Sequence, residues 1–189
     1  MTDETKPLDQ KIQLQNGTTL EIRLARPSDG AEMLAYLNRI GGESDFLTFG
    51  ENGIDLPVEM EAQIIQENLD APNTMMLLGL VEDEIIACAH LSPMGRNRIG
   101  HNGDLGISVR KDFWGCGVGT AMMNATISLT RSATTLTIIR LTVSVENERG
   151  LRLYERLGFQ RTGTEPKFFC INGRYVDAVL LYLDLSEQK

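Results

Sequence analysis

Positive charge is scarce in this chain of 189 residues, in which 18 lysines and arginines stand against 26 aspartates and glutamates. The net charge of −8 argues against a basic surface of the kind that binds nucleic acid or anionic membranes. We therefore expect neither nucleic acid nor a membrane as a partner. Acidic domains are common because net charge aids solubility, so the excess of carboxylates favours a cationic ligand only weakly.

Cysteine, metal-ligand clusters and long apolar runs are scarce as well. Cys88, Cys116 and Cys170 form no C-x-x-C pair, so we expect free thiols and a reducing compartment. No second ligand stands at metal spacing from His90, and no metal is predicted. Residues 1–11 lack the apolar core of a signal peptide, and no run approaches the ~18 apolar residues of a membrane span. These absences predict a cytoplasmic protein.

The apolar patterns of the chain predict its elements. With 42% hydrophobic residues and no linker, residues 11–189 are expected to form a single domain behind a flexible tail, 1–10. Strands are expected at 12–14, 20–24, 75–81, 85–92, 101–109, 138–145, 159–164 and 174–185. This order, with helices between, indicates a mixed α/β (α+β) sheet rather than a doubly wound nucleotide-binding fold.

Four helices are predicted from apolar spacing and from capping residues. The first should follow Asp29 and stop at Gly41 and Gly42. The third should begin near Gly117, and the fourth should cover 147–157. The second should start at Pro57, and the residues expected on its buried face are Val58, Ala62, Ile65 and Leu69.

A glycine-rich loop follows the strand-like run that ends at Val109. Gly115, Gly117 and Gly119 are spaced by two, so backbone N–H groups can point into one concavity at a helix N-terminus, which is a site for phosphate. The dinucleotide fingerprint would need glycine at position 120 or 122, and a Walker A loop would need a Gly-Lys-Ser/Thr end; neither is present. On the loop alone, a plain chain-reversing turn stays open.

A second motif lies about thirty residues further on. Its residues follow the pattern Asn-x-x-Gly-x-x-Leu-Tyr-x-x-x-Gly-Phe and are Asn147, Gly150, Leu153, Tyr154, Gly158 and Phe159. The two motifs together resemble the GNAT superfamily of acyl-CoA-dependent N-acetyltransferases, from about Leu20 to Leu185. Two positions depart from that family's pattern: Gly150 replaces an alanine, and Trp114 replaces the usual arginine or glutamine before the glycines.

The resemblance implies the GNAT fold, a central and mostly antiparallel sheet with splayed strands flanked by helices, and acetyl-CoA as cosubstrate. Pantetheine would pair with the exposed strand backbone, and an N–H near Val109 would steady the oxyanion. Tryptophan cannot donate forked hydrogen bonds, so backbone N–H groups should hold the pyrophosphate and Trp114 should pack. The expected cofactor contacts are Ile107, Val109, Trp114, Gly115, Cys116, Gly117, Val118, Gly119, Thr120, Asn147 and Tyr154.

The resemblance also suggests catalytic roles. Tyr154 is the expected general acid, because a phenol with a pKa near ~10 can protonate a thiolate whose thiol has a pKa of about 8.5. The alternative is a core tyrosine, just as Asn147 is either a cofactor contact or a helix N-cap. For the general base, the main candidates are Asp104 and Glu51, and His101 and Asp45 are further candidates. Each of them is more typical of a solvated polar residue than of a catalyst, and bulk water is an alternative acceptor of the proton.

The expected function is transfer of an acetyl group from acetyl-CoA directly to a primary amine of a small molecule, peptide or protein. The alternative is a non-catalytic acyl-CoA-binding or sensor module of the same fold. The acceptor stays open, because residues 43–56 are equally compatible with an acceptor pocket and with an ordinary helix–helix connection. Dimers are common in this family, so a homodimer is among the expectations, although no sequence feature encodes one.

Overall fold

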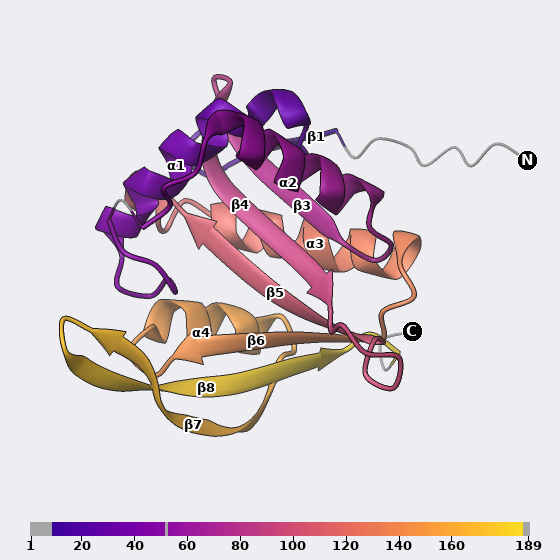
Figure 1. Cartoon of the computed structure of the whole chain (residues 1–189), viewed down its shortest axis with the longest axis vertical. Helices are drawn as coiled ribbons and strands as arrows, with labels where there is room; N and C mark the ends of the chain where they lie inside the picture. Colours follow the sequence, from indigo (N-terminus) through magenta and orange to yellow (C-terminus); the bar gives the residue numbers. More distant parts are fainter. Residues whose placement is uncertain (1–8, 52, 187–189) are drawn as a thin grey trace, which may run out of the picture.

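The computed structural model describes residues 9–51 and 53–186 (Figure 1). An eight-stranded sheet has the order β1-β2-β3-β4-β5-β6-β8-β7, and every neighbouring pair is antiparallel except β5 and β6. The strands are β1 (Gln10–Gln13), β2 (Thr19–Leu24), β3 (Met75–Val81), β4 (Glu84–Pro93), β5 (Asn102–Val109), β6 (Ile138–Ser144), β7 (Gln160–Ile171) and β8 (Arg174–Asp184). The expected mixed, mostly antiparallel sheet is confirmed.

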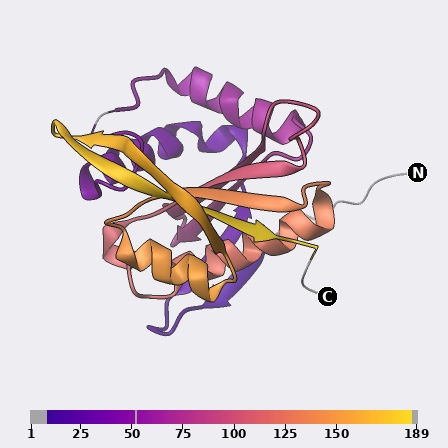
Figure 2. The ribbon, with the colours of Figure 1, turned by 90° about the horizontal axis from the view of Figure 1, so that it is seen from below.

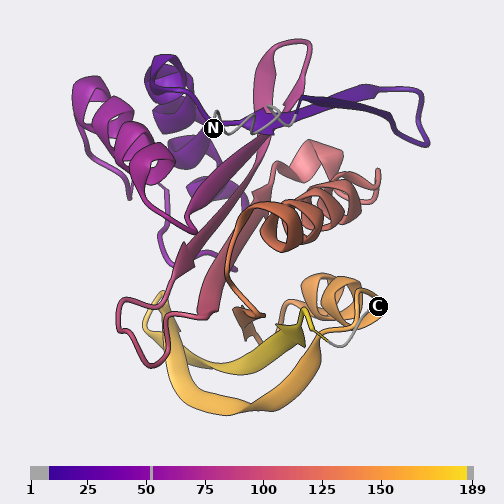
Figure 3. The same cartoon turned by 90° about the vertical axis from the view of Figure 1, so that its right-hand side faces the viewer.

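Helices cover both faces of this sheet. They are α1 (Gly30–Glu43), α2 (Val58–Asp70), α3 (Val118–Ala133) and α4 (Glu148–Arg156). Helices α1 and α2 lie on one face, and α3 and α4 lie on the other (Figures 2 and 3). Alternate residues of β3 therefore enter different cores: Leu77 packs on the α3 side and Leu78 on the α1–α2 side. Burial on both faces explains why β3 is a continuous apolar run.

Strands β5 and β6 are joined for only three residue pairs. Their parallel register covers Asn102–Asp104 against Ile138–Arg140. Beyond that point, β5 pairs only with β4 and β6 pairs only with β8. Figure 1 shows the two strands diverging from this junction, so that α4, β6, β8 and β7 form a lower half that is separated from β5.

Helix α1 does not stop at Gly41 and Gly42 but continues through them to Glu43. A Cβ on Gly41 would lie 2.2 Å from the carbonyl oxygen of Gly50. Gly41 is therefore needed for the close approach of the following loop and not as a helix terminator. The prediction that the helix stops at Gly41 and Gly42 was wrong, because glycine is favoured both at a helix C-cap and where a distant segment approaches the helix closely.

The predicted buried face of α2 was wrong at both of its ends. Val58 and Leu69 are 45% and 42% exposed, whereas Glu61 and Ile65 are buried. The helix is turned so that Glu61, Ile65 and Asn68 face the sheet, where Asn68 Oδ1 lies 3.1 Å from His90 Nε2. Burial raises the pKa of Glu61. Polar side chains, Glu61 and Asn68 of α2 and His90 of β4, therefore lie between α2 and the sheet. The spacing of apolar residues alone could not reveal them.

Strand β7 runs to Ile171, well past the predicted end at residue 164. It is an edge strand, where Pro166 removes no ladder hydrogen bond that the sheet requires. The register shifts between Glu165 and Phe169, and the Lys167 N–H donates to Asp177 Oδ1 at 2.8 Å. Most of the predicted tail, residues 1–8, lies outside the described residues. Within 9–51 and 53–186, no helix is both long and apolar enough to cross a membrane.

Gly41→Ala should destabilise the protein and displace the loop that follows α1. Overpacking of this kind costs about 1–3 kcal/mol, which urea denaturation would measure. Gly42→Ala is the matched control, because its Cβ would meet only the flexible Glu51 side chain, at 3.3 Å. It should be neutral or slightly stabilising, since alanine favours a helix over glycine. Equal losses in the two variants would contradict this account of Gly41.

Candidate active site

A cavity opens where β5 leaves β6. One wall comes from β5 and the turn after it, through Ile107, Ser108, Val109, Phe113, Trp114 and Gly115. A second wall comes from Gly119 of α3 and from the start of α4, including Asn147, Arg149, Leu153 and Tyr154. The third wall is formed by α1 and its loop, through Ile40, Glu43, Ser44, Phe46 and Leu47. The cavity thus passes through the split and connects the two faces of the sheet.

The backbone of β5 presents free groups to this cavity. The carbonyl of Val109 accepts a 2.7 Å hydrogen bond from Trp114 Nε1, whereas the N–H of Arg110 donates to Ile86 of β4. Peptide groups alternate in direction along a strand, and the N–H and C=O of one residue point to the same side. The N–H groups of Ile107 and Val109 therefore point into the split, where β6 no longer pairs with them.

The glycine loop leads into α3 through two left-handed residues. Gly115 and Gly117 have φ values of 82° and 92°, which side chains other than glycine rarely adopt. Gly117 is the N-cap, so the N–H groups from Gly117 to Thr120 have no partner within the helix and mark its positive end. The buried Val118 side chain belongs to the core. Cys116, Gly117 and Thr120 line a separate groove between β1 and α3.

Arg149 is a cavity residue that the sequence prediction missed. Its guanidinium lies over the Trp114 ring, 5.1 Å from the centroid, and it forms no ion pair with any residue that the structure describes. The two residues come from α4 and from the glycine loop, 35 positions apart. The sequence signal that was available is that Trp114 and Arg149 each lie within one of the two motifs. Their stacking, however, depends on how the two halves of the sheet pack.

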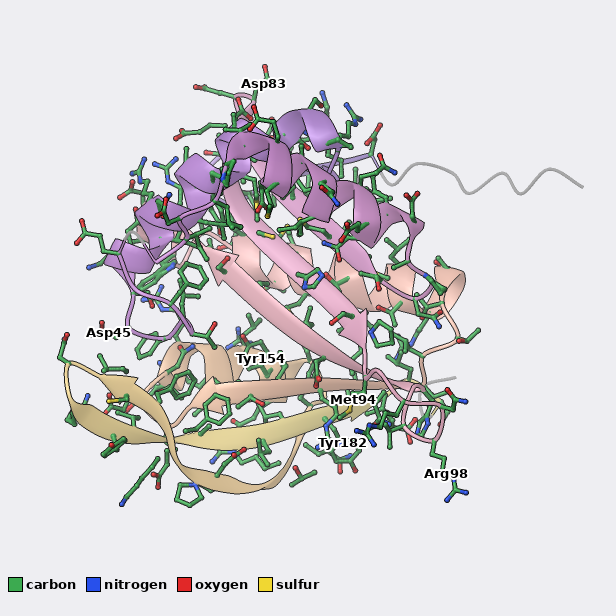
Figure 4. All side chains as sticks on the ribbon, in the orientation of Figure 1. Asp45, Asp83, Met94, Arg98, Tyr154 and Tyr182 are labelled. Atoms are coloured by element: carbon green, nitrogen blue, oxygen red, sulfur yellow. The ribbon has the colours of Figure 1, made fainter. Side chains whose placement is uncertain are left out.

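Tyr154 lies on α4 and lines the cavity. Figure 4 shows it in the space between β5 and the lower half of the molecule. Its ring packs edge-on against Phe159 with centroids 5.9 Å apart, and its hydroxyl has no hydrogen-bond partner among residues 9–51 and 53–186. Burial raises the pKa of Tyr154 to about 12, so the hydroxyl stays protonated at neutral pH.

Asn147 is the N-cap of α4. Its Oδ1 accepts a 2.9 Å hydrogen bond from the Gly150 N–H, which satisfies one of the free donors of the helix start. The side chain also lines the cavity. The helix-cap role that was one of its two interpretations is thus present, and a cofactor contact stays a prediction.

The candidate carboxylates are not gathered in the cavity. Asp104 lies on β5 and is exposed, Glu51 is exposed in the turn after Gly50, and neither lines the cavity. Glu43 does line it, but both oxygens are occupied: Oε1 accepts from Arg39 Nε at 2.9 Å and Oε2 from the Lys111 N–H at 2.7 Å.

The described residues of the segment 43–51 and 53–56 combine the two interpretations that the sequence left open. Phe46 and Leu47 line the cavity, whereas Phe49 packs against the core under α1. Within the described part of the chain, no group of three or more histidine, cysteine or acidic side chains is placed to hold a metal ion.

The split in the sheet, the glycine-rich N-terminus of α3 beside it and Tyr154 on α4 opposite it agree with the arrangement that the GNAT resemblance implies. The model of the Acetyltransferase (GNAT) family matches residues 44–159, which is more than half of the chain. The protein therefore belongs to the GNAT family of acetyltransferases, and the family expected from the sequence is confirmed. Acetyl-CoA is the cosubstrate of these enzymes.

Three relatives place the chain within this family. It is 32% identical over 114 residues to the L-amino acid N-acetyltransferase AaaT of Escherichia coli, covering 60% of this chain and 70% of that protein. It is 31% identical over 87 residues to the spermidine N(1)-acetyltransferase of Vibrio cholerae, covering 46% and 50%. The structure of a GNAT acetyltransferase from Streptococcus pneumoniae superposes with a TM-score of 0.83 at 28% identity, covering 87% and 98%.

Proposed function

We propose that this protein transfers the acetyl group of acetyl-CoA directly to a primary amine of a small molecule. The observation that carries the proposal is the unpaired edge of β5, where the N–H groups of Ile107 and Val109 open into a cavity opposite Tyr154. The names of the two sequence relatives add support, because L-amino acids and spermidine are both small amines.

The donor enters from the α3–α4 side in this proposal. The pantetheine amides pair with the free backbone edge at Ile107 and Val109, while Trp114 already occupies the Val109 carbonyl. The pyrophosphate lies against the N–H groups from Gly115 to Thr120 at the positive end of α3. Arg149, stacked on Trp114 and free of carboxylate partners among the described residues, supplies the positive charge that the loop itself lacks.

The amine nitrogen attacks the thioester carbonyl, and the backbone N–H near Val109 stabilises the oxyanion that forms. The new C–N bond replaces the C–S bond. The proton lost by the nitrogen balances the one that the CoA sulfur gains. Tyr154, kept neutral by burial, donates its hydrogen bond to the sulfur as negative charge develops there. Of the two main candidate bases, Asp104 is favoured over Glu51 because it lies on the strand that forms the cavity wall.

Tyr154→Phe should lower kcat by about 10²-fold and leave the Kd for acetyl-CoA almost unchanged, because only the hydroxyl is removed. Purified protein would be incubated with acetyl-CoA and a panel of primary amines, with CoA thiol release and the mass of the acetylated amine as readouts. Thermal unfolding is the control, since phenylalanine keeps the ring that packs on Phe159. Unchanged turnover would remove Tyr154 from the mechanism.

Two further outcomes of this experiment bear on the function as a whole. Steady CoA release with at least one amine supports the enzyme. Saturable binding of acetyl-CoA without turnover across the entire panel would instead indicate a non-catalytic acyl-CoA-binding module and would overturn the proposal.

Arg149→Ala should raise the Kd for acetyl-CoA about tenfold, because hydrogen bonds to charged groups contribute ~1.5–3 kcal/mol. Turnover of S-acetylpantetheine, which has no phosphate, should not change. Arg152→Ala is the matched control: Arg152 lies three residues further along α4 and pairs with Glu148 at 3.0 Å. An equal loss with S-acetylpantetheine would show that Arg149 does not act on the phosphates.

A further inference from the structure

The acceptor side of the cavity offers no free carboxylate. Among the described residues that line the cavity, Glu43 is the only acid, and Arg39 and Lys111 occupy both of its oxygens. The wall beside it is apolar, formed by Ile40, Phe46 and Leu47. A polycationic amine would need several free carboxylates here, so the wall suits an acceptor with a neutral, apolar group.

One face of β5 extends from this cavity to Asp104. Asp104, Gly106 and Ser108 alternate along the strand and therefore face the same side, about 13 Å from end to end. That side is the α1 side, because Ser108 Oγ lies 2.9 Å from the Tyr36 hydroxyl. A Cβ placed on Gly106 would find no heavy atom within 4 Å. The space directly above Gly106, which lies between Ser108 of the cavity wall and Asp104, is thus open.

At the far end of this face of β5, Asp104 and Arg140 place opposite charges on neighbouring strands. Asp104 and Arg140 are the last register partners of β5 and β6 before the strands part. Paired positions on neighbouring strands are ~4.8 Å apart and put their side chains on the same face. Even so, neither side chain forms a hydrogen bond or an ion pair with any described residue.

The register partner of Arg140 on β8 already has a hydrogen-bond partner elsewhere. Tyr182 of β8 is its register partner on the far side, and the Tyr182 hydroxyl donates to Gln160 Oε1 at 3.0 Å. Figure 4 shows Tyr182 in the lower half of the molecule, near the junction of the two strands. Arg140 and Asp104 therefore present a free cation and a free anion side by side at the inner end of the split.

We propose that the acceptor is a free α-amino acid with a neutral, apolar side chain. The inference rests on the proposed acetyl transfer and names its substrate class. The Arg140 guanidinium binds the carboxylate of the acceptor through charge-assisted hydrogen bonds, and the Asp104 carboxylate faces its ammonium group and takes up the proton. The amine lies over Gly106, next to the thioester, and the side chain packs on Phe46 and Leu47.

The test compares L-leucine with two amines of the same side chain that lack a free carboxylate and with one polycation. Initial rates of CoA release with the full-length protein would be measured for L-leucine, L-leucinamide and isoamylamine, which lacks the carboxyl group, with spermidine as the polycation. We expect kcat/KM for L-leucine to exceed that for each of the other three by at least ~10-fold, the effect of losing one hydrogen-bonded charge.

Arg140→Ala should abolish this preference. It should lower kcat/KM for L-leucine by ~10-fold or more, chiefly through KM, and lower that for isoamylamine far less, because isoamylamine has no carboxylate to bind. Arg98→Ala is the matched control, because Arg98 is exposed at the same end of the molecule and points away from the sheet (Figure 4). Its acceptor preference should equal that of the unaltered protein. Thermal unfolding of both variants would verify folding.

The outcomes separate the inference from the function on which it rests. Acetylation of isoamylamine, leucinamide or spermidine as efficiently as L-leucine would overturn the inference and leave acetyl transfer intact. A leucine preference that survives Arg140→Ala would also overturn it. Absence of turnover with every amine would overturn the proposed function itself.

Discussion

The parallel ladder between β5 and β6 lasts for three residue pairs and then stops, and the rest of the site depends on that interruption. A buried strand edge without partners is costly, because each backbone N–H and C=O needs a hydrogen bond. The protein satisfies only part of this edge itself, through Trp114 on the Val109 carbonyl. The N–H groups left over are the donors that an extended, amide-containing cosubstrate such as acetyl-CoA can use.

The two sides of the cavity are joined by a small charged network. Glu43, at the end of α1, accepts from the Lys111 N–H in the turn that precedes the glycine loop. Arg39 pairs with Glu43 and reaches Asp112 of the same turn at 3.0 Å. The end of α1, which forms one wall of the cavity, is therefore tied to the turn that leads into the wall at Trp114 and Gly115. Gly41 fits this arrangement, since the loop that follows α1 can approach the helix closely only where no side chain intervenes.

The features that the sequence predicted well are local. Most strands, the glycine loop and the α4 motif follow from spacing over a few residues, and the Asn147 cap depends on a contact only three positions away. Features that depend on distant contacts were missed. Gly41 was interpreted as a helix stop, Glu61 was not expected to be buried, and Arg149 was not recognised beside Trp114.

The same distinction between local features and distant contacts applies to the candidate site. Ile107, Val109, Trp114, Gly115, Gly119, Asn147 and Tyr154 were expected and line one cavity. Six other expected residues do not line that cavity, namely Glu51, Asp104, Cys116, Gly117, Val118 and Thr120. The cavity wall on the α1 side could not be derived from spacing, because it is built from α1, its loop and an alternating face of β5. Which face Asp104 and Ser108 occupy depends on sheet register, which a single sequence does not reveal.

Amide hydrogen exchange along β5 tests the central claim, that acetyl-CoA binds in the split, most directly. In the free protein, the N–H groups of Ile107 and Val109 should exchange faster than those of Ser108 and Arg110, which point toward β4. Saturating acetyl-CoA should slow Ile107 and Val109 by at least ~10-fold and change the other two little. Unchanged exchange at Ile107 and Val109 in the saturated protein would contradict the account.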